Sequence, residues 1–393
     1  MRRVSGPGDF ARRATRAVAG FTSTRSKGPD AMFGGPDGPT HVVRADGARI
    51  VTADGRELLD WTMALGAVGL GYGHPRVREA AERAVRDGAV GPLPHVLEVE
   101  VAERLCAAYP GAEQARFFKT GAEAVQAAVR LARVATGRER VVHAGYHGWL
   151  DGATGGRGVP DATSRLWTAV PFDDPGALEA ALAGPELPAA IVLEPVVERA
   201  PSAAWLAGAR RLASDRGAML VFDEIKTAFR LAAGGAAERW GVVPDLAVLG
   251  KALANGFPLA AVVGRADVMA RVRETWISST LATEFVALAA AGAVLDVWGE
   301  VDVAGHIAQV GRRMLDALGA RGAPVPYTVS GMPEMWFLRF GDDAGERRFL
   351  LACAARGVLL KRGAYDFPSL AHGAGEIETT LAVVREAARE VAA

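Results

Sequence analysis

The chain has 393 residues, of which 50% are apolar, and its 45 basic and 45 acidic side chains give a formal net charge of zero. A chain of this length and composition buries a large core and is expected to form about two domains. The balanced charge gives no general reason to bind nucleic acid, and no apolar run reaches the ~18 residues of a membrane span, so small-molecule chemistry is the favoured function class.

The cysteines and the first residues bear on whether the chain binds a metal and where in the cell it is located. Cys106 and Cys353 lie in helix-like apolar contexts without metal-ligand spacing, so we expect buried thiols and no metal site. The basic start, Met-Arg-Arg, is not followed by a signal-like apolar core. A cytoplasmic location is therefore the expectation.

The first 60 residues predict an arm followed by a β unit. Residues 1–40 are rich in Gly, Pro, Ser, Thr and basic side chains, which is typical of an irregular arm, with one helix near residues 9–19. Residues 40–61 alternate apolar and polar side chains around two Ala-Asp-Gly turn signals, as short antiparallel strands do. We interpret residues 1–60 as the arm and β unit of a small domain.

Helical segments alternate with short apolar strands from about residue 75 onward. The predicted strands are residues 115–118, 140–143, 189–193, 219–222, 246–249 and 260–263. Continuous apolar strands separated by helices indicate a mostly parallel sheet with helices on both faces, so residues 61–270 are predicted to form a large α/β domain.

The pattern changes after Ala270. A long Ala-rich helix is predicted through Val294, then further helices, a strand region at residues 334–340 and a terminal helix from Glu376. Residues 271–393 are therefore predicted to form a smaller α+β domain.

Two of the predicted strands deliver a charged residue at their carboxyl ends. Asp223 ends the apolar run Leu220-Val-Phe, and Lys251 follows Leu246-Ala-Val-Leu-Gly. Open α/β sheets bind ligands at this edge, so both side chains are expected to face one ligand. Pyridoxal 5′-phosphate (PLP) needs an amine to form an imine and an acid beside its pyridine nitrogen. Taken singly, Asp223 also fits a helix N-cap and Lys251 a solvated loop lysine.

Three further strand ends carry residues suited to this ligand. Gly121 begins an amphipathic helix whose N-terminus suits a phosphate, although Thr120-Gly-Ala-Glu also fits an ordinary capped helix start. Tyr146 follows another strand, where an aromatic ring stacks on a pyridine or packs in the core. Glu194 follows Ile191-Val-Leu, so its carboxylate is either aimed at the same crevice or part of a turn.

Together these motifs resemble those of class III (fold type I) PLP-dependent aminotransferases, most closely the glutamate-1-semialdehyde 2,1-aminomutase-like proteins. The motifs that carry the resemblance are Leu59-Asp-Trp, Gly71-Tyr-Gly-His-Pro, Thr120-Gly-Ala-Glu-Ala, Gly145-Tyr-His-Gly, Leu193-Glu-Pro, Phe222-Asp-Glu-Ile-Lys-Thr-Ala-Phe-Arg, Gly234-Gly, Gly241-Val-Val-Pro-Asp-Leu and Leu249-Gly-Lys with Asn255-Gly. The resemblance covers nearly the whole chain and implies a mostly parallel seven-stranded sheet plus a smaller α+β domain.

The resemblance also implies roles for single residues. Lys251 would hold PLP as a Schiff base and then shuttle the proton, and Asp223 would pair with the pyridine nitrogen. The other residues that the resemblance assigns to the cofactor are Gly121 and Ala122 at the phosphate, Ile225 and Tyr146 on the two ring faces, His147, Glu194, and Thr280 at the phosphate of a neighbouring subunit. A homodimer with shared active sites follows.

Departures from the family pattern concern the substrate more than the cofactor. Ala122 stands where a hydroxyl residue is usual, which removes one possible phosphate hydrogen bond. Arg199 stands where the aminomutase has a cofactor-contacting Asn, and Leu65 replaces its pocket tryptophan; both argue against glutamate-1-semialdehyde. Arg25 aligns loosely with the family's arm arginine, and either clamps a substrate carboxylate or is solvated or dimer-bridging.

These residues predict an aminotransferase that moves an amino group between an amino donor and a keto or aldehyde acceptor by a ping-pong Schiff-base mechanism in specialised metabolism. An aminomutase or a PLP-dependent racemase is the alternative, and a non-catalytic PLP-fold protein is the remote one. The expected partners are the small-molecule donor and acceptor and a second copy of the chain, with no nucleic acid and no membrane.

Overall fold

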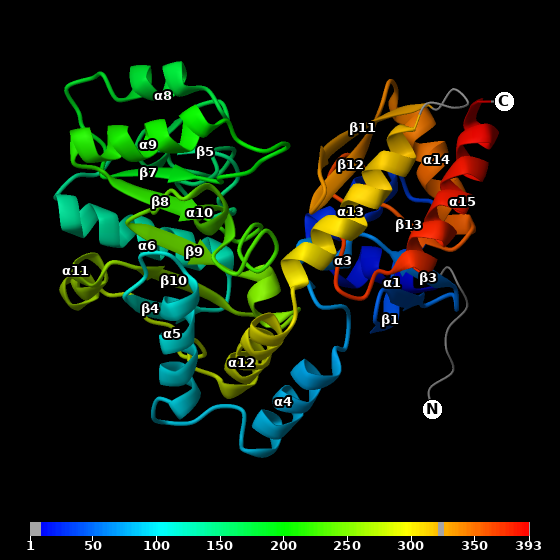
Figure 1. Ribbon diagram of the computed structural model, residues 1–393, viewed down its shortest axis with the longest axis horizontal. Coiled ribbons are helices and arrows are strands. Elements are labelled where there is room, and N and C mark those ends of the chain that lie inside the picture. The colour runs from blue at the N-terminus through cyan, green and yellow to red at the C-terminus, as the bar shows by residue number, and fades with distance from the viewer. Residues whose placement is uncertain (1–8, 321–325, 393) are drawn as a thin grey trace. The chain divides into compact units, whose positions relative to one another are not determined.

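The computed structural model describes residues 9–320 and 326–392, which form two compact units. One unit is Pro75–Ala304, and the other combines the described residues before Pro75 with those after Ala304 (Figure 1). The sequence pattern instead puts its domain boundaries at residues 60 and 270, and that division stays a prediction. No helix in the described ranges is long and apolar enough to cross a membrane.

The Pro75–Ala304 unit is built on a seven-stranded sheet with the strand order β4-β10-β9-β8-β7-β5-β6. Its strands are β4 Gln114–Phe118, β5 Val141–Ala144, β6 Trp167–Ala169, β7 Ala190–Leu193, β8 Met219–Asp223, β9 Leu246–Leu249 and β10 Ala260–Gly264. Only β10 runs in the direction opposite to the other strands of the sheet. The predicted mostly parallel, seven-stranded α/β architecture is confirmed.

Both faces of this sheet are buried. Along β7, Val192 packs into the core cluster formed with helix α6, and its neighbours Ile191 and Leu193, which point to the opposite face, are also fully buried. Such strands read as continuous apolar runs because helices cover both sides. The central strands therefore fix the positions of the residues that follow them.

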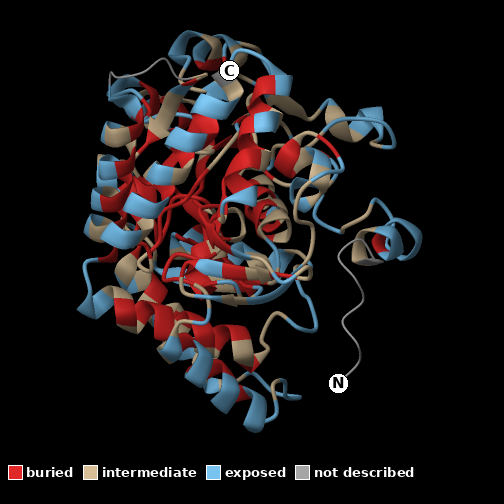
Figure 2. Cartoon of the chain, turned by 90° about the vertical axis from the view of Figure 1, so that its right-hand side faces the viewer, coloured by how far each residue is buried: buried red, intermediate tan, exposed pale blue. Residues whose placement is uncertain are grey.

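The helices of this unit surround the sheet. They are α4 Pro75–Arg86, α5 Val96–Ala108, α6 Gly121–Thr136, α7 Asp161–Ser164, α8 Pro175–Ala181, α9 Ala203–Arg216, α10 Gly235–Trp240, α11 Ala266–Met269 and α12 Phe285–Glu300, with 3-10 turns η2 Lys251–Ala254 and η3 Ala270–Glu274. Across the whole chain, helices in Figure 2 carry buried residues on one side and exposed residues on the other.

The Ala-rich helix begins later than the sequence pattern predicts. We expected it from about Ala270, whereas the 3-10 turn η3 ends at Glu274 and α12 starts at Phe285. The residues between include Ser278, Ser279 and other hydroxyl side chains, which compete with helical hydrogen bonding. The carboxylate of Glu284 then caps α12 by accepting from two of its first N–H groups.

The other unit contains two small sheets. The four-stranded sheet has the order β1-β2-β3-β13, and β11 pairs with β12. The strands are β1 Val42–Asp46, β2 Arg49–Thr52, β3 Glu57–Asp60, β11 Tyr327–Met332, β12 Met335–Phe340 and β13 Val358–Leu359. The predicted antiparallel N-terminal strands are present, and β13 joins them in parallel to β3.

Helices complete this second unit around a core rich in aromatic side chains. They are α1 Asp9–Ala17, η1 Arg25–Lys27, α2 Pro29–Phe33, α3 Met63–Gly66, α14 Asp343–Ala355 and α15 Ala374–Ala392, and α13 Val303–Gly319 begins at the boundary between the units. Trp61 and Trp336 are fully buried against each other, with ring centroids 5.6 Å apart. The N-terminal strands and the C-terminal segment thus share one core.

Candidate active site

The carboxyl ends of the central strands surround a cavity of about 220 Å³. It is lined by Thr120, Gly121, Ala122, Tyr146, Gly148, Trp149, Glu194, Asp223, Ile225, Lys226 and Lys251. Four of these residues stand at the ends of β5, β7, β8 and β9, which is the edge where α/β sheets bind ligands. The structure therefore brings together seven of the predicted site residues.

Lys251 leaves the end of β9 in a strained conformation. Its φ is +48°, in the left-handed region that costs a non-glycine residue about 1–3 kcal/mol. Burial, the charge of Lys226 and, more weakly, that of Arg230 lower the pKa of the Lys251 amine from 10.5 to about 8, against the opposing effects of Glu194 and Asp223. The amine therefore releases its proton closer to neutral pH than an ordinary lysine does, which favours its action as a nucleophile.

Asp223 is fixed by hydrogen bonds to both of its oxygens. His147 Nδ1 lies 2.8 Å from Asp223 Oδ2, and the Ile225 N–H donates to Oδ1 over 3.3 Å. His147 Nε2 lies 3.1 Å from the Ala144 carbonyl, which can only accept, so Nε2 carries a proton. The imidazole therefore links the Asp223 carboxyl group to the backbone of β5. His147 thus lies behind Asp223 and does not line the cavity.

The N-terminus of α6 forms another wall of the cavity. Thr120 and Glu123 form a reciprocal capping box, which leaves the N–H groups of Gly121 and Ala122 without partners inside the helix. A Cβ on Gly148 would lie 2.5 Å from Ala122 Cβ, so only glycine allows this close packing. The wall presents helix-end N–H groups and the positive end of the helix dipole, which suit a phosphate.

Ile225 provides an apolar surface between two glycines. A Cβ on Gly121 would lie 2.4 Å from Ile225 Cδ1, and one on Gly250 would lie 3.5 Å from Ile225 Cγ1. Tyr146 also lines the cavity and is 66% exposed. The cavity therefore combines apolar and aromatic surface with an amine, a carboxylate and a helix N-terminus, and this set of groups fits PLP.

Lys226 is a cavity residue that the sequence analysis did not single out. Its ammonium lies 3.0 Å from Glu194 Oε1, and the second oxygen of Glu194 accepts from the N–H of Tyr146 over 2.8 Å. The available signal was its position, three residues after Asp223 and past the end of the same strand. Thr120, Gly148 and Trp149 also line the cavity, although the sequence analysis assigned them no role in the site.

The remaining predicted residues lie outside this cavity. Thr280 is exposed in the segment before α12, and Arg199 forms an ion pair with Asp173 in which its side chain is 59% exposed. Arg25 is exposed in η1, and Leu65 is partly buried in α3 with a φ of +61°; both belong to the other compact unit. Their substrate and cofactor roles stay predictions.

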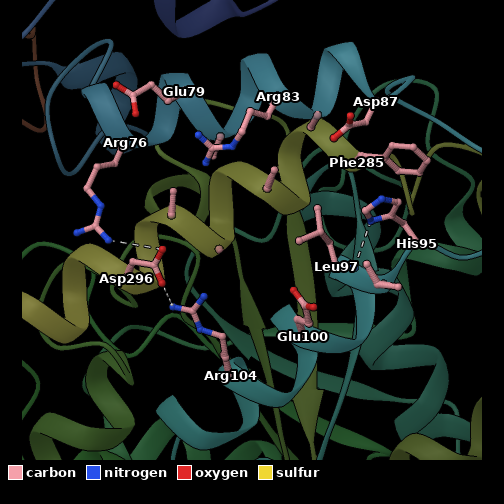
Figure 3. A pocket seen from close by; sticks show the side chains of 16 residues that line it. Arg76, Glu79, Arg83, Asp87, His95, Leu97, Glu100, Arg104, Phe285 and Asp296 are labelled. Atoms are coloured by element: carbon pink, nitrogen blue, oxygen red, sulfur yellow. Dashed lines mark hydrogen bonds and ion pairs between the residues drawn. The ribbon is translucent and has the colours of Figure 1, made fainter.

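Two of the larger cavities lack this chemistry. One of about 520 Å³ lies among α4, α5 and α12, where Arg76 and Arg104 both pair with Asp296 and the His95 imidazole accepts from the Leu97 N–H (Figure 3). The other, of about 580 Å³ and mostly apolar, lies within the second unit and includes Leu65. Within the described ranges, no cluster of three or more metal-ligating side chains occurs.

The sequence matches the family described as aminotransferase class-III over residues 35–167 and 177–370. The glutamate-1-semialdehyde 2,1-aminomutase of Thermomicrobium roseum is 35% identical, over 90% of this chain and 92% of that protein. Among solved structures, the FumI protein of Sphingopyxis sp. MTA144 in its PLP internal aldimine form has a TM-score of 0.93 and 25% identity, over 98% of this chain and 96% of its own. An omega-transaminase from Sphaerobacter thermophilus has a TM-score of 0.88 and 26% identity, over 100% and 99%.

Proposed function

Since the chain belongs to the class III aminotransferase family, whose cofactor is PLP, we propose that it moves an amino group between a small-molecule amino donor and a keto or aldehyde acceptor in ping-pong order. The observation that carries this proposal is the single cavity shared by Lys251, Asp223 and the N-terminus of α6. A role in specialised metabolism and a cytoplasmic location remain part of the proposal.

Lys251 has the central role in the proposed reaction. PLP, when bound, supplies an aldehyde and an electron-withdrawing pyridinium ring. The lowered pKa of Lys251 lets its amine bond to the cofactor near neutral pH. When it is not bonded to the cofactor, the Lys251 amine would remove the α-proton of the amino donor and hold it for return on the product side. Because Lys251 begins a 3-10 turn between two buried strands, its backbone stays fixed during this exchange.

The surrounding residues orient the cofactor in this proposal. Asp223, backed by His147, would keep the pyridine nitrogen protonated, because an adjacent carboxylate favours the charged form of the ring. The N–H groups at the start of α6 would hold the phosphate, and Ile225 and Tyr146 would pack on the two ring faces. Each role uses a side chain or backbone group that already faces the cavity.

We also propose a homodimer, which exposed apolar side chains in the Pro75–Ala304 unit support. Leu93 and Trp276 are 76% and 82% exposed. The N–H of Phe285 donates to the Ala89 carbonyl over 2.7 Å, which joins the start of α12 to the segment before Leu93. A second copy covering this surface would receive Thr280, which lies in the same region.

A double variant with Leu93→Asp and Trp276→Asp tests the dimer. We expect sedimentation velocity to show a monomer, together with weaker PLP binding. A double variant that stays dimeric would rule out this surface as the interface.

An aminomutase is a second candidate, favoured by the 35% identity to a glutamate-1-semialdehyde 2,1-aminomutase over most of both chains. Such an enzyme, or a racemase, completes its reaction on one molecule and needs no separate acceptor. Turnover of a single substrate by the PLP-loaded enzyme, with no keto acid or aldehyde added, would favour this candidate. A requirement for two substrates favours the aminotransferase.

The visible absorption spectrum tests the proposed function directly. We expect the PLP-loaded protein to show an absorption band that a panel of amino donors bleaches selectively, and Lys251→Ala to lack this band. The donor that bleaches the band identifies half of the reaction. A wild-type protein that binds PLP but responds to no donor would point to the non-catalytic alternative, and a band that persists in Lys251→Ala would remove Lys251 from its proposed role.

A further inference from the structure

The cavity contains a second lysine whose charge the proposed reaction does not use. Lys226 is only 8% exposed, although lysine is almost never buried without a partner. Its partner is Glu194 at 3.0 Å, and its ammonium also lies 3.4 Å from the Val197 carbonyl. Lys226 and Lys251 line the same cavity of about 220 Å³.

This ion pair is held in a defined geometry. The N–H of Tyr146 donates to the second oxygen of Glu194. Gly145, with a φ of +104°, lets the backbone approach so closely that a Cβ there would lie 2.7 Å from the Glu194 side chain. The side chains of Lys226 and Glu194 are 9% and 13% exposed, so water and salt screen their charges weakly. The pair therefore acts on its neighbours as a fixed dipole.

The neighbour on which this dipole acts is Lys251. After burial, the charge of Lys226 is the largest influence that lowers the pKa of Lys251, and it exceeds the opposing influence of Glu194. The charged and titratable groups around this amine are Lys226, Arg230, Glu194, Asp223 and Tyr146, with His147 behind Asp223.

We propose that the Lys226–Glu194 pair controls the protonation of Lys251: the buried Lys226 cation disfavours a second positive charge on the Lys251 amine and makes Lys251 the reactive lysine of the cavity. Lys226 is then a positioning residue that acts through Lys251, while its own amine is held by Glu194. This inference rests on the proposed role of Lys251 in the reaction.

Lys226 and Glu194 have opposite effects on the protonation of Lys251, so the proposal predicts opposite changes when each of them is replaced. Lys226→Met removes the cation and leaves the Glu194 carboxylate without its partner, so the protonated form of Lys251 is favoured. Glu194→Gln leaves the cation without its partner, so the uncharged form is favoured. Lys226→Arg keeps the charge and is the matched control.

Competitive acylation of the cofactor-free full-length protein measures this directly. A small amine-reactive reagent is applied across a pH series, and peptide mass spectrometry reads the labelling of Lys251. For Lys226→Met we expect the pH at which Lys251 labelling is half-maximal to rise by about one unit, which corresponds to roughly tenfold less labelling at pH 7. For Glu194→Gln we expect the midpoint to fall, and for Lys226→Arg we expect it to stay near that of the wild type.

Circular dichroism and the melting temperature of each variant establish that it is folded. The proposal would be overturned if Lys226→Met left the labelling midpoint of Lys251 unchanged in the folded protein. It would also be overturned if Lys226→Met and Glu194→Gln moved that midpoint in the same direction, because a loss of packing does not depend on the sign of the charge removed. The labelling contains no PLP, so its outcome is separate from the spectroscopic test. If Lys251→Ala kept the visible band, the proposed function would fail while the electrostatic coupling could still be measured.

Discussion

Replacing Lys251 by methionine is expected to stabilise the cofactor-free protein near neutral pH. Methionine keeps the length and apolar stem of the side chain but carries no ammonium. The amine pKa falls from 10.5 to about 8 on folding, chiefly because burial disfavours the charged form. At pH 7 the protonated lysine therefore costs the folded state about 3 kcal/mol, which the variant recovers.

The stability gained by Lys251→Met should depend on pH between the folded and unfolded pKa values of the lysine. Below pH 8 Lys251 is protonated in both the folded and the unfolded chain, so burial of its charge destabilises the folded wild type by the whole amount. Between pH 8 and 10.5 the unfolded chain binds more protons than the folded one, so the stability of the wild type rises with pH and the advantage of Lys251→Met shrinks. We expect a difference of about 3 kcal/mol at pH 7 to fall to about 1 kcal/mol at pH 9.5.

Urea unfolding of both proteins at the two pH values tests this expectation. Groups outside the cavity titrate alike in the two chains and cancel in the difference, and the apolar contacts of methionine add the same amount at each pH. The change with pH therefore isolates the buried charge. A difference between variant and wild type that is the same at pH 7 and pH 9.5 would refute the electrostatic account of Lys251.

Further substitutions test the support around the cavity. His147→Leu removes the hydrogen-bond partner of the buried Asp223 Oδ2, and we expect the free energy of unfolding to fall by about 2 kcal/mol in urea titrations; a loss within measurement error would contradict this role of His147. Gly148→Ala combines a φ of +93° with a contact of 2.5 Å to Ala122, so it should displace the start of α6 and weaken PLP binding in a fluorescence titration. Gly155→Ala is its control, because a Cβ there meets nothing within 4 Å, and equal affinities in the two variants would contradict the role of the α6 N-terminus.

The strand ends were predictable from the sequence because their signals are local. Short apolar runs that end in Asp223 and before Lys251 mark both a buried strand and its ligand-facing end, and the structure places these residues in one cavity. The antiparallel direction of β10 also has a local cause, since the short turn through Asn255 leaves no room for a crossover helix. β6 was missed because three residues beginning at Trp167 carry too little pattern, and its strand character comes from pairing with β5.

The role of Lys226 shows where local patterns stop being informative. In the sequence it is one more charged residue after a strand, and a solvated lysine would have the same neighbours along the chain. Its burial depends on Glu194, which follows a different strand and is itself oriented by the backbone of Tyr146. Parallel strands bring these ends to one edge, so a cation placed after β8 acts on the amine placed after β9. The same edge carries the unfavourable backbone of Lys251, so the sheet, buried on both faces, supplies the stability that offsets strain and charge concentrated at the cavity.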